Sequence, residues 1–232
     1  MGYKYLLIDN DNTLMDFNAA EKAALRDTLV ACGLPTDEET LMTYHRINDG
    51  LWKALERGET TQARLKVERF ELLLAALGRT EPSAQALCDM YTEQLGCHAE
   101  LLPGAMALME ALCGKVKIAL VSNGVSRIQR GRLSRCPFTP MLDAVVISEE
   151  VGVRKPDPAM LFVAMEALGC TDIRQAVMMG DSLTADIAAA NNAGMDAIFY
   201  DRKGVGSDKA TYVIRELHEA ADAFRRSQEA TP

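Results

Sequence analysis

The sequence predicts an α/β fold, a doubly wound parallel sheet into which an all-α helical cap domain is inserted. A short apolar run at residues 5–8 is typical of a buried strand, and strand and helix patterns alternate after residue 101. Between residues 15 and 96 the strand signal is absent. Alternating strands and helices indicate βαβ crossovers, which build a parallel sheet with helices on both faces. We therefore expect residues 1–15 and 101–232 to form the α/β core, and residues 16–100 to form the helical domain.

The inserted segment carries helix start and stop signals in regular succession. Asn18 with Glu21, and Thr36 with Glu39, match the capping-box spacing, and each helix pattern runs to a glycine. We expect four helices, which stop at Gly33, Gly58, Gly78 and Gly96. Since the insert follows the first strand directly, we expect it to stand over the ligand site as a cap.

The alternating part of the chain predicts the rest of the sheet and its covering helices. We expect strands at residues 117–121, 144–147, 176–179 and 197–200, with a short edge strand at 212–214. Helices are expected at residues 105–112, 126–134, 158–168, 182–193 and 215–226.

Composition limits the possible partners. The chain has 232 residues, 48% of them hydrophobic, and a formal net charge of −8, which argues against a nucleic acid polymer as partner because phosphate backbones are bound by basic surfaces. No apolar stretch approaches the roughly 20 residues of a membrane span, so we expect no membrane partner and a cytoplasmic location. The six cysteines include no CxxC pair and are expected to be buried free thiols.

The chemistry is expected where the first strand ends. Asp9 and Asp11 are two residues apart, so in an extended chain both face the same spot beyond the strand. Open α/β sheets bind their ligands at that edge. Like charges so close repel each other unless a cation lies between them, which indicates a divalent metal. A plain polar turn remains the alternative interpretation of this stretch alone.

Three further polar clusters follow predicted strands. Ser122 and Asn123 precede a glycine at a helix start and could bind a phosphate, while Lys155 is fixed by a following proline. Asp181 ends a strand, and Asp186 lies one helical turn beyond it. Each cluster alone also fits a bland role: a helix cap, a solvated lysine, or acidic residues at a helix N-terminus. Their joint occurrence at one sheet edge favours a single site.

These residues resemble the four motifs of the haloacid dehalogenase (HAD) superfamily, in the right order. DNDNT at residues 9–13 is similar to its first motif, Ser122 in VSNG to its second, Lys155 in RKPDP to its third, and GDSLTAD at 180–186 to its fourth. The insert resembles the C1 helical cap of subfamily I. The first and fourth motifs look most like the house-cleaning nucleoside 5′-monophosphatases, although Asn12 departs from the commoner glycine.

The resemblance implies a magnesium-dependent phosphatase acting on a small phosphorylated metabolite. Asp9 would be the nucleophile and Asp11 the general acid and base. Mg²⁺ would be held by Asp9, the Asp11 backbone carbonyl and Asp181, with Asp186 behind them. The resemblance also gives a phosphate-binding role to Ser122, Asn123 and Lys155.

Other functions stay open from the sequence alone. Related enzymes include phosphoglycolate and sugar-phosphate phosphatases, phosphomutases and haloacid dehalogenases, the last of which lack a second aspartate like Asp11. A receiver-type signalling switch is a remote alternative, because such a domain is shorter and lacks the insert. In the cap, five residues could meet a nucleobase or sugar or could simply be core: Phe17, Tyr44, His45, Asn48 and Trp52. The sequence leaves a monomer or a small homo-oligomer open.

Overall fold

The computed structural model describes the backbone of residues 2–229 and the side chains of residues 2–224. The chain forms two compact units, an α/β unit of Met1–Phe17 with Ala99–Pro232 and a helical unit of Asn18–His98. The sequence placed these boundaries at residues 15/16 and 100/101. The two segments that connect the units pair with each other, because Met15 forms an antiparallel bridge with Leu101 and the amide of Leu102 donates to the carbonyl of Leu14 at 2.9 Å.

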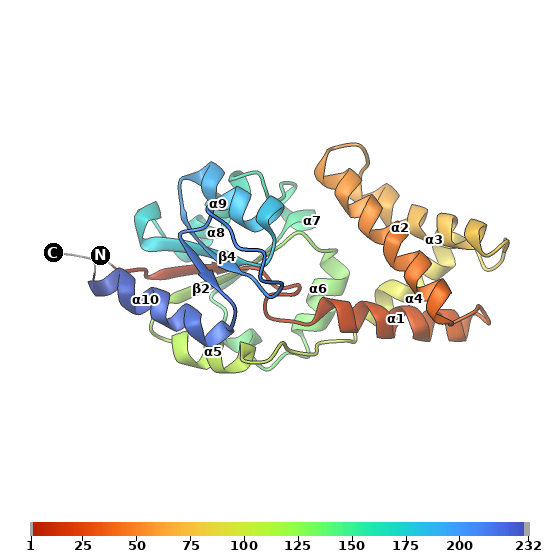
Figure 1. Cartoon of the computed structure of the whole chain (residues 1–232), viewed down its shortest axis with the longest axis horizontal. Coiled ribbons are helices and arrows are strands. Elements are labelled where there is room, and N and C mark those ends of the chain that lie inside the picture. Colours follow the sequence, from red (N-terminus) through yellow and green to blue (C-terminus); the bar gives the residue numbers. More distant parts are fainter. Residues whose placement is uncertain (1, 230–232) are drawn as a thin grey trace. The chain divides into compact units, whose positions relative to one another are not determined.

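The α/β unit contains a six-stranded parallel sheet, which confirms the predicted fold class. Its strand order is β3-β2-β1-β4-β5-β6, so β1 lies between β2 and β4 near the centre (Figure 1). The apolar runs read from the sequence form these strands, whose bounds are Tyr5–Ile8 (β1), Lys117–Ser122 (β2), Ala144–Ile147 (β3), Ala176–Gly180 (β4), Asp196–Tyr200 (β5) and Tyr212–Ile214 (β6).

Helices cover both faces of this sheet, and each face has its own apolar core. Leu6 and Ile8 of β1 pack with α5 (Ala105–Leu112) and α10 (Ala220–Glu229). Leu7 points to the opposite face, where α8 (Ala159–Leu168) and α9 (Ala188–Ala193) lie (Figure 1). This alternation is the period-2 pattern of a strand buried on both sides. Packing on both faces holds the strand ends of the sheet in position.

The helical unit is built from α1 (Phe17–Ala31, which begins at the end of the α/β unit), α2 (Glu38–Glu56), α3 (Gln62–Ala76) and α4 (Ala84–Leu95). Its centre is aromatic: Tyr44, Phe70 and Tyr91 pack with ring centroids 5.4–5.7 Å apart. Tyr44 is fully buried and Asn48 nearly so. These two residues are therefore core residues of the unit, whereas the side chain of His45 is exposed.

Two helix starts differ from the predicted capping boxes. Asn18 lies inside α1, which begins at Phe17, and α2 takes Asp37 as its N-cap, with the Asp37 carboxylate accepting from the amide of Thr40 at 2.9 Å. A second acceptor one residue after Thr36 therefore takes the cap. The predicted glycine stops at residues 33, 58 and 78 have positive φ, as helix-ending glycines commonly do.

The region predicted as one helix over residues 182–193 is divided. Residues Leu183–Ile187 form a π-type turn, and regular α-helix begins only with α9. π-turns are often found at functional sites. A short helix α7 (Ser148–Val151) was not predicted, and the last helix begins at Ala220, five residues later than expected, after a 3₁₀ turn at Leu217–Glu219. Two further 3₁₀ turns lie at Thr139–Met141 and Ile173–Gln175.

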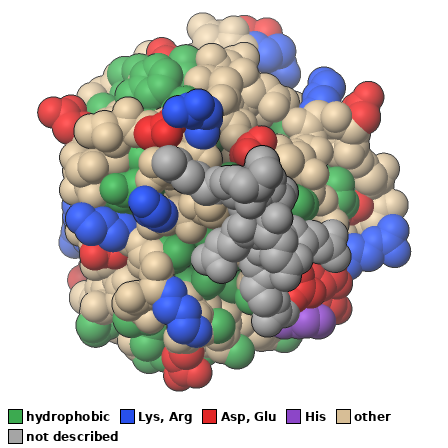
Figure 2. Space-filling model, turned by 90° about the vertical axis from the view of Figure 1, so that its left-hand side faces the viewer, with side chains coloured by type: hydrophobic (Ala, Val, Ile, Leu, Met, Phe, Trp, Pro, Cys, Tyr) green, Lys and Arg blue, Asp and Glu red, His purple; other side chains and the backbone are tan. Residues whose placement is uncertain are grey.

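The surface and the cysteines add three observations. Cys97 and Cys113 are exposed, which corrects the expectation of buried thiols for these two, although all six cysteines are free. Within the described part of the chain, every helix is too short or too polar to cross a membrane. On the face seen in Figure 2, the described basic and acidic side chains are interspersed, so neither sign of charge forms a large patch there.

Candidate active site

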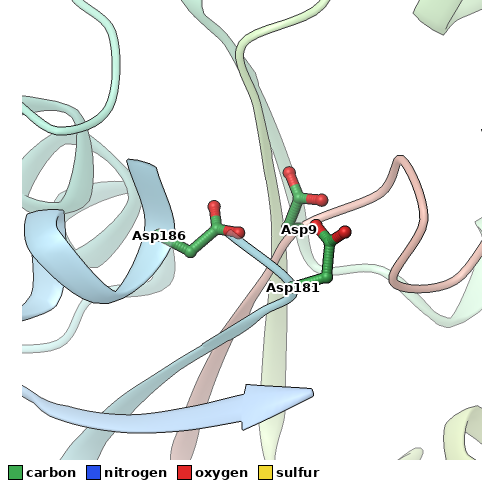
Figure 3. Close-up of side chains that lie close together, drawn as sticks. All are labelled: Asp9, Asp181 and Asp186. Atoms are coloured by element: carbon green, nitrogen blue, oxygen red, sulfur yellow. The ribbon is translucent and has the colours of Figure 1, made fainter. Parts of the chain in front are cut away.

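The site is built at the carboxyl ends of neighbouring strands in the α/β unit. Asp9 follows β1 directly, and its amide donates to the carbonyl of Met179 in β4 at 2.9 Å. Asp181 follows β4 directly. Because β1 and β4 are parallel neighbours, both aspartates emerge at the same edge of the sheet. Figure 3 shows the carboxylates of Asp9 and Asp181 side by side, with that of Asp186 facing them from the turn after β4.

Lys155 is the cation of this cluster. Its Nζ lies 2.6 Å from Asp9 Oδ1 and 2.7 Å from Asp186 Oδ1, and it donates to the carbonyl of Val121 at 2.6 Å. The side chain is 1% exposed. Asn123 holds the Lys155 backbone, since its Oδ1 accepts from the Lys155 amide at 2.9 Å and its Nδ2 donates to the Lys155 carbonyl at 2.7 Å. The lysine thus reaches the aspartates from a fixed backbone.

The π-type turn orients the carboxylate of Asp186 toward the cluster. Its Oδ2 accepts from the amide of Ser182 at 3.0 Å. A Cβ atom on Gly180 would lie 2.1 Å from that same oxygen, a distance that no side chain could occupy. The glycine before Asp181 therefore leaves the space in which the Asp186 carboxylate lies.

The electrostatics of the cluster are unbalanced. Burial and, to a smaller extent, the charge of Asp186 raise the pKa of Asp181 to about 7, against the opposing effect of Lys155. Burial also raises the pKa of Asp9, against the opposing effect of Lys155. Burial disfavours the Lys155 cation, but the Asp186 and Asp9 carboxylates outweigh it and raise the pKa of Lys155. One ammonium group is thus surrounded by more negative charge than it can neutralise.

These side chains fit a hard divalent cation. One carboxylate oxygen each from Asp9, Asp181 and Asp186 lies within 4.8 Å of the others. Oxygen ligands of this kind are what Mg²⁺ prefers, and a cation here would offset the excess negative charge. The family resemblance implied a role for Asp186 behind the ligands. The structure places its carboxylate both in this acidic group and against Lys155.

The turn after β2 lies at the same edge. Ser122 is the last residue of β2 and is almost fully buried, and its Oγ accepts from the amide of Gly124 at 3.0 Å. The preceding residue, Val121, provides the carbonyl bound by Lys155. The structure thus brings the turn of Ser122 and Asn123 next to the cluster, while their contact with a phosphate stays a prediction.

Asp11 makes contacts that the sequence analysis missed. Gln129 of α6 (Ser126–Leu133) donates through Nε2 to Asp11 Oδ2 at 2.7 Å, and Arg132 of the same helix pairs with Asp11 Oδ1. The only signal in the sequence is a pair of polar residues three positions apart on one face of a predicted helix. Such pairs are usually solvated, and nothing distinguished this one.

Comparison with known proteins identifies the family of this chain. A family model described as haloacid dehalogenase-like hydrolase matches residues 3–194, which include every predicted site residue. The chain belongs to this family.

Two of the similar proteins are pyrimidine 5′-nucleotidases. The chain is 35% identical over 202 residues to pyrimidine 5′-nucleotidase PynA of Streptococcus pneumoniae, covering 87% of this chain and 85% of PynA. It is 30% identical to pyrimidine 5′-nucleotidase YjjG of Escherichia coli, covering 94% and 96% of the two chains.

A solved structure of the family is also similar over nearly the whole chain. The putative HAD-hydrolase YfnB of Bacillus subtilis, bound to magnesium, matches with a TM-score of 0.90 and 31% identity, covering 97% of this chain and 99% of YfnB. This hydrolase therefore shares both its sheet unit and its helical unit with a magnesium-binding relative.

Proposed function

We propose that this hydrolase is a magnesium-dependent phosphatase that removes phosphate from nucleoside 5′-monophosphates, pyrimidine nucleotides above all. The observation that carries the proposal is the convergence of Asp9, Lys155 and the acidic pair Asp181 and Asp186 at one edge of the sheet. The nucleotide preference is supported by similarity to two pyrimidine 5′-nucleotidases over most of the chain.

In the first half of the reaction, an Asp9 carboxylate oxygen forms a bond to phosphorus while the ester P–O bond breaks. The electron pair of that bond stays on the leaving oxygen, which takes a proton from Asp11 and departs as the nucleoside hydroxyl. An aspartyl-phosphate remains on Asp9. Lys155, which touches the Asp9 carboxylate, is placed to orient it and to bind an oxygen of the phosphoryl group.

In the second half, a water oxygen attacks phosphorus and the acyl-phosphate bond breaks, which restores the Asp9 carboxylate. Asp11, having lost its proton, accepts one from the attacking water. Inorganic phosphate leaves and both carboxyl groups return to their starting forms. Ser122 and the amide of Asn123 are assigned to the remaining phosphoryl oxygens, because they lie on the turn beside Lys155.

A bound Mg²⁺ would lower the repulsion between the negative charges of substrate and site. The residues that would hold it are Asp9, Asp181 and the Asp11 backbone carbonyl. Asp186 holds Lys155 from the other side.

Asp11 favours ester hydrolysis over dehalogenation. A halide leaves without a proton, but the oxygen of a nucleoside leaves as an alkoxide unless an acid protonates it. A carboxyl group two residues after the nucleophile is therefore useful to a phosphatase, and a dehalogenase has no need of it.

The proposal predicts a clear activity profile. Purified protein with Mg²⁺ is expected to release phosphate from uridine and deoxyuridine 5′-monophosphates faster than from purine nucleotides, phosphoglycolate or glucose 1-phosphate. Phosphate release is measured for each compound. A phosphomutase would be recognised by a phosphorylated product without free phosphate, and it would overturn the proposal.

Two variants separate the parts of the proposal. Asp9→Asn is expected to reduce phosphate release to background, and Asp11→Asn to slow it roughly 10²–10⁴-fold, the range for loss of a general acid and base. An Asp9→Asn protein as active as the parent would remove Asp9 as the nucleophile. Equal rates on all phosphate esters would remove only the nucleotide preference.

A further inference from the structure

The side chain of Asp11 is held on both of its oxygens by one helix. Gln129 Nε2 donates to Oδ2 at 2.7 Å, and the Arg132 guanidinium pairs with Oδ1. Gln129 and Arg132 are one helical turn apart on α6, so both reach the same point. Because each oxygen has its own donor, the carboxylate cannot rotate without breaking a hydrogen bond.

Asn10 fixes the orientation of Gln129. The Nδ2 group of Asn10 donates to Gln129 Oε1 at 2.6 Å, and both side chains are almost completely buried. The carboxylate of Asp11 only accepts hydrogen bonds when ionised, so the Gln129 amide nitrogen must face Asp11 and its oxygen must face Asn10. The residue between the two aspartates thereby sets the direction of the donor that binds the second one.

Gly124 makes room for Gln129. A Cβ atom at position 124 would lie 2.4 Å from Gln129 Nε2 and 2.9 Å from its Cγ. Any residue larger than glycine at position 124 would therefore displace Gln129 from Asp11. The turn assigned to phosphate binding therefore packs directly against Gln129, the residue that binds Asp11.

Arg132 is also completely buried. Its side chain is 0% exposed, and its guanidinium lies 5.8 Å from the centre of the Phe17 ring. Asp11, in contrast, keeps 23% of its side chain exposed. The donors are thus buried, while the carboxylate they hold remains accessible to a substrate.

We propose that Gln129 and Arg132 are positioning residues that fix the Asp11 carboxyl group for proton transfer to the leaving oxygen and from the attacking water. This inference rests on the proposed function, in which Asp11 is the acid and base. Proton transfer needs the carboxyl group within about 2.6–3.2 Å of the reacting oxygen. A carboxylate has about four lone-pair sites, so two donors leave sites free for the reaction.

The test compares two substrates that differ in their need for a proton. The oxygen of uridine 5′-monophosphate must be protonated as it leaves, whereas p-nitrophenyl phosphate releases a phenolate that is stable without a proton. In Gln129→Met, which keeps the length of the side chain but not its hydrogen bonds, the first turnover with the nucleotide is expected to slow roughly 10–100-fold. The rate of the first turnover with p-nitrophenyl phosphate is expected to change much less. KM for the nucleotide is expected to stay within about twofold of the parent value, because the variant alters the position of Asp11 and not substrate binding.

Arg132 is tested with a matched control on the same helix. Arg130 pairs with Glu150 and has a half-exposed side chain, so Arg130→Met removes an arginine of α6 that does not contact Asp11. We expect Arg130→Met to keep parent rates, Arg132→Met to show the same substrate-dependent loss as Gln129→Met, and Arg132→Lys to recover part of it. If Arg132→Met fails to fold, Gln129→Met and Arg132→Lys still decide the question.

The outcomes separate this inference from the proposed function. A parent protein without phosphatase activity overturns both. An active parent with an unchanged Gln129→Met overturns only the positioning role, and so does an equal loss on the two substrates, which would indicate general damage to the fold.

Discussion

At the scale of single residues, the charge of Lys155 compensates the buried carboxylates of the site. It is the cation between Asp9 and Asp186, and all three side chains are buried. Removing one partner of a buried ion pair typically costs about 3–5 kcal/mol, because the remaining charge is left without compensation. In this cluster two carboxylates would be left facing each other.

We therefore predict that Lys155→Met lowers the free energy of unfolding by about 3–5 kcal/mol and abolishes phosphate release. Urea denaturation measures the first effect. The double variant Lys155→Met/Asp186→Asn should recover part of the stability, because one of the two opposed charges is removed, but none of the activity. A Lys155→Met protein as stable as the parent would contradict the compensation of Asp9 and Asp186 by Lys155.

The residues of the site were predictable to different degrees. Asp9 and Asp181 directly follow β1 and β4, and a parallel sheet brings strand ends to one edge, so their convergence follows from topology. Lys155 and Asp186 lie further along the segments that follow β3 and β4, which begin at the same edge. Gln129 and Arg132 lie within a helix, away from any strand end, where the sequence carries no such marker. Their function depends on the side of α6 that faces Asp11, which only the packed structure determines.

At the scale of elements, a buried polar network joins three helices of the helical unit. Glu21 of α1 accepts from Asn48 of α2 at 2.7 Å, and Asn48 accepts from Arg69 of α3 at 3.2 Å. The other carboxylate oxygen of Glu21 lies 3.1 Å from His45 Nδ1. Burial raises the pKa of Glu21 above its ordinary value, against the opposing effects of His45 and Arg69.

This network predicts a pH-dependent stability. Because the pKa of Glu21 is higher in the folded than in the unfolded chain, protonation of Glu21 stabilises the fold. That stabilisation is complete below the unfolded pKa, near 4.5, and is lost as pH rises through the folded pKa. Glu21→Gln removes this titration, so the melting temperature of the parent should fall relative to the variant as pH rises from about 4.5 toward neutrality. Parallel pH curves for the two proteins would contradict this prediction.

Element boundaries were predicted less well than element types. The strands of the sheet were recognised because their apolar runs are continuous, and the glycine stops marked helix ends at residues 33, 58 and 78. Starts were harder, since several acceptors compete: Thr36 and Asp37 both suit an N-cap, and Asp37 takes the role. The π-type turn at residues 183–187 has no local signature, because its sequence fits a regular helix equally well.

At the scale of the whole molecule, the site residues all belong to one of the two compact units. The acidic group of Asp9, Asp181 and Asp186 lies in the α/β unit, whereas Trp52, the only tryptophan, lies in the helical unit. Trp52 fluorescence therefore reports on the helical unit, while a ligand of the acidic group would bind in the α/β unit. A ligand of the acidic group is expected to stabilise the α/β unit directly.

We predict that Mg²⁺ raises the melting temperature followed by far-ultraviolet circular dichroism. At a hundredfold excess over the dissociation constant, binding contributes about 2.7 kcal/mol, or about 5–10 °C for a domain of this size. The transition followed by Trp52 fluorescence should shift less, and chelation of the metal should reverse the effect. Asp181→Asn is the control, and a full shift that persists in this variant would exclude the acidic group as the magnesium site.

The pairing of Met15 with Leu101 allows the inserted segment to be replaced during evolution. The chain leaves the α/β unit and returns to it at adjacent residues, so a tight turn could connect the same two segments in place of the inserted helices. Every residue assigned to chemistry precedes residue 12 or follows residue 121. The inserted helices therefore form a module whose replacement would leave every residue assigned to chemistry in place.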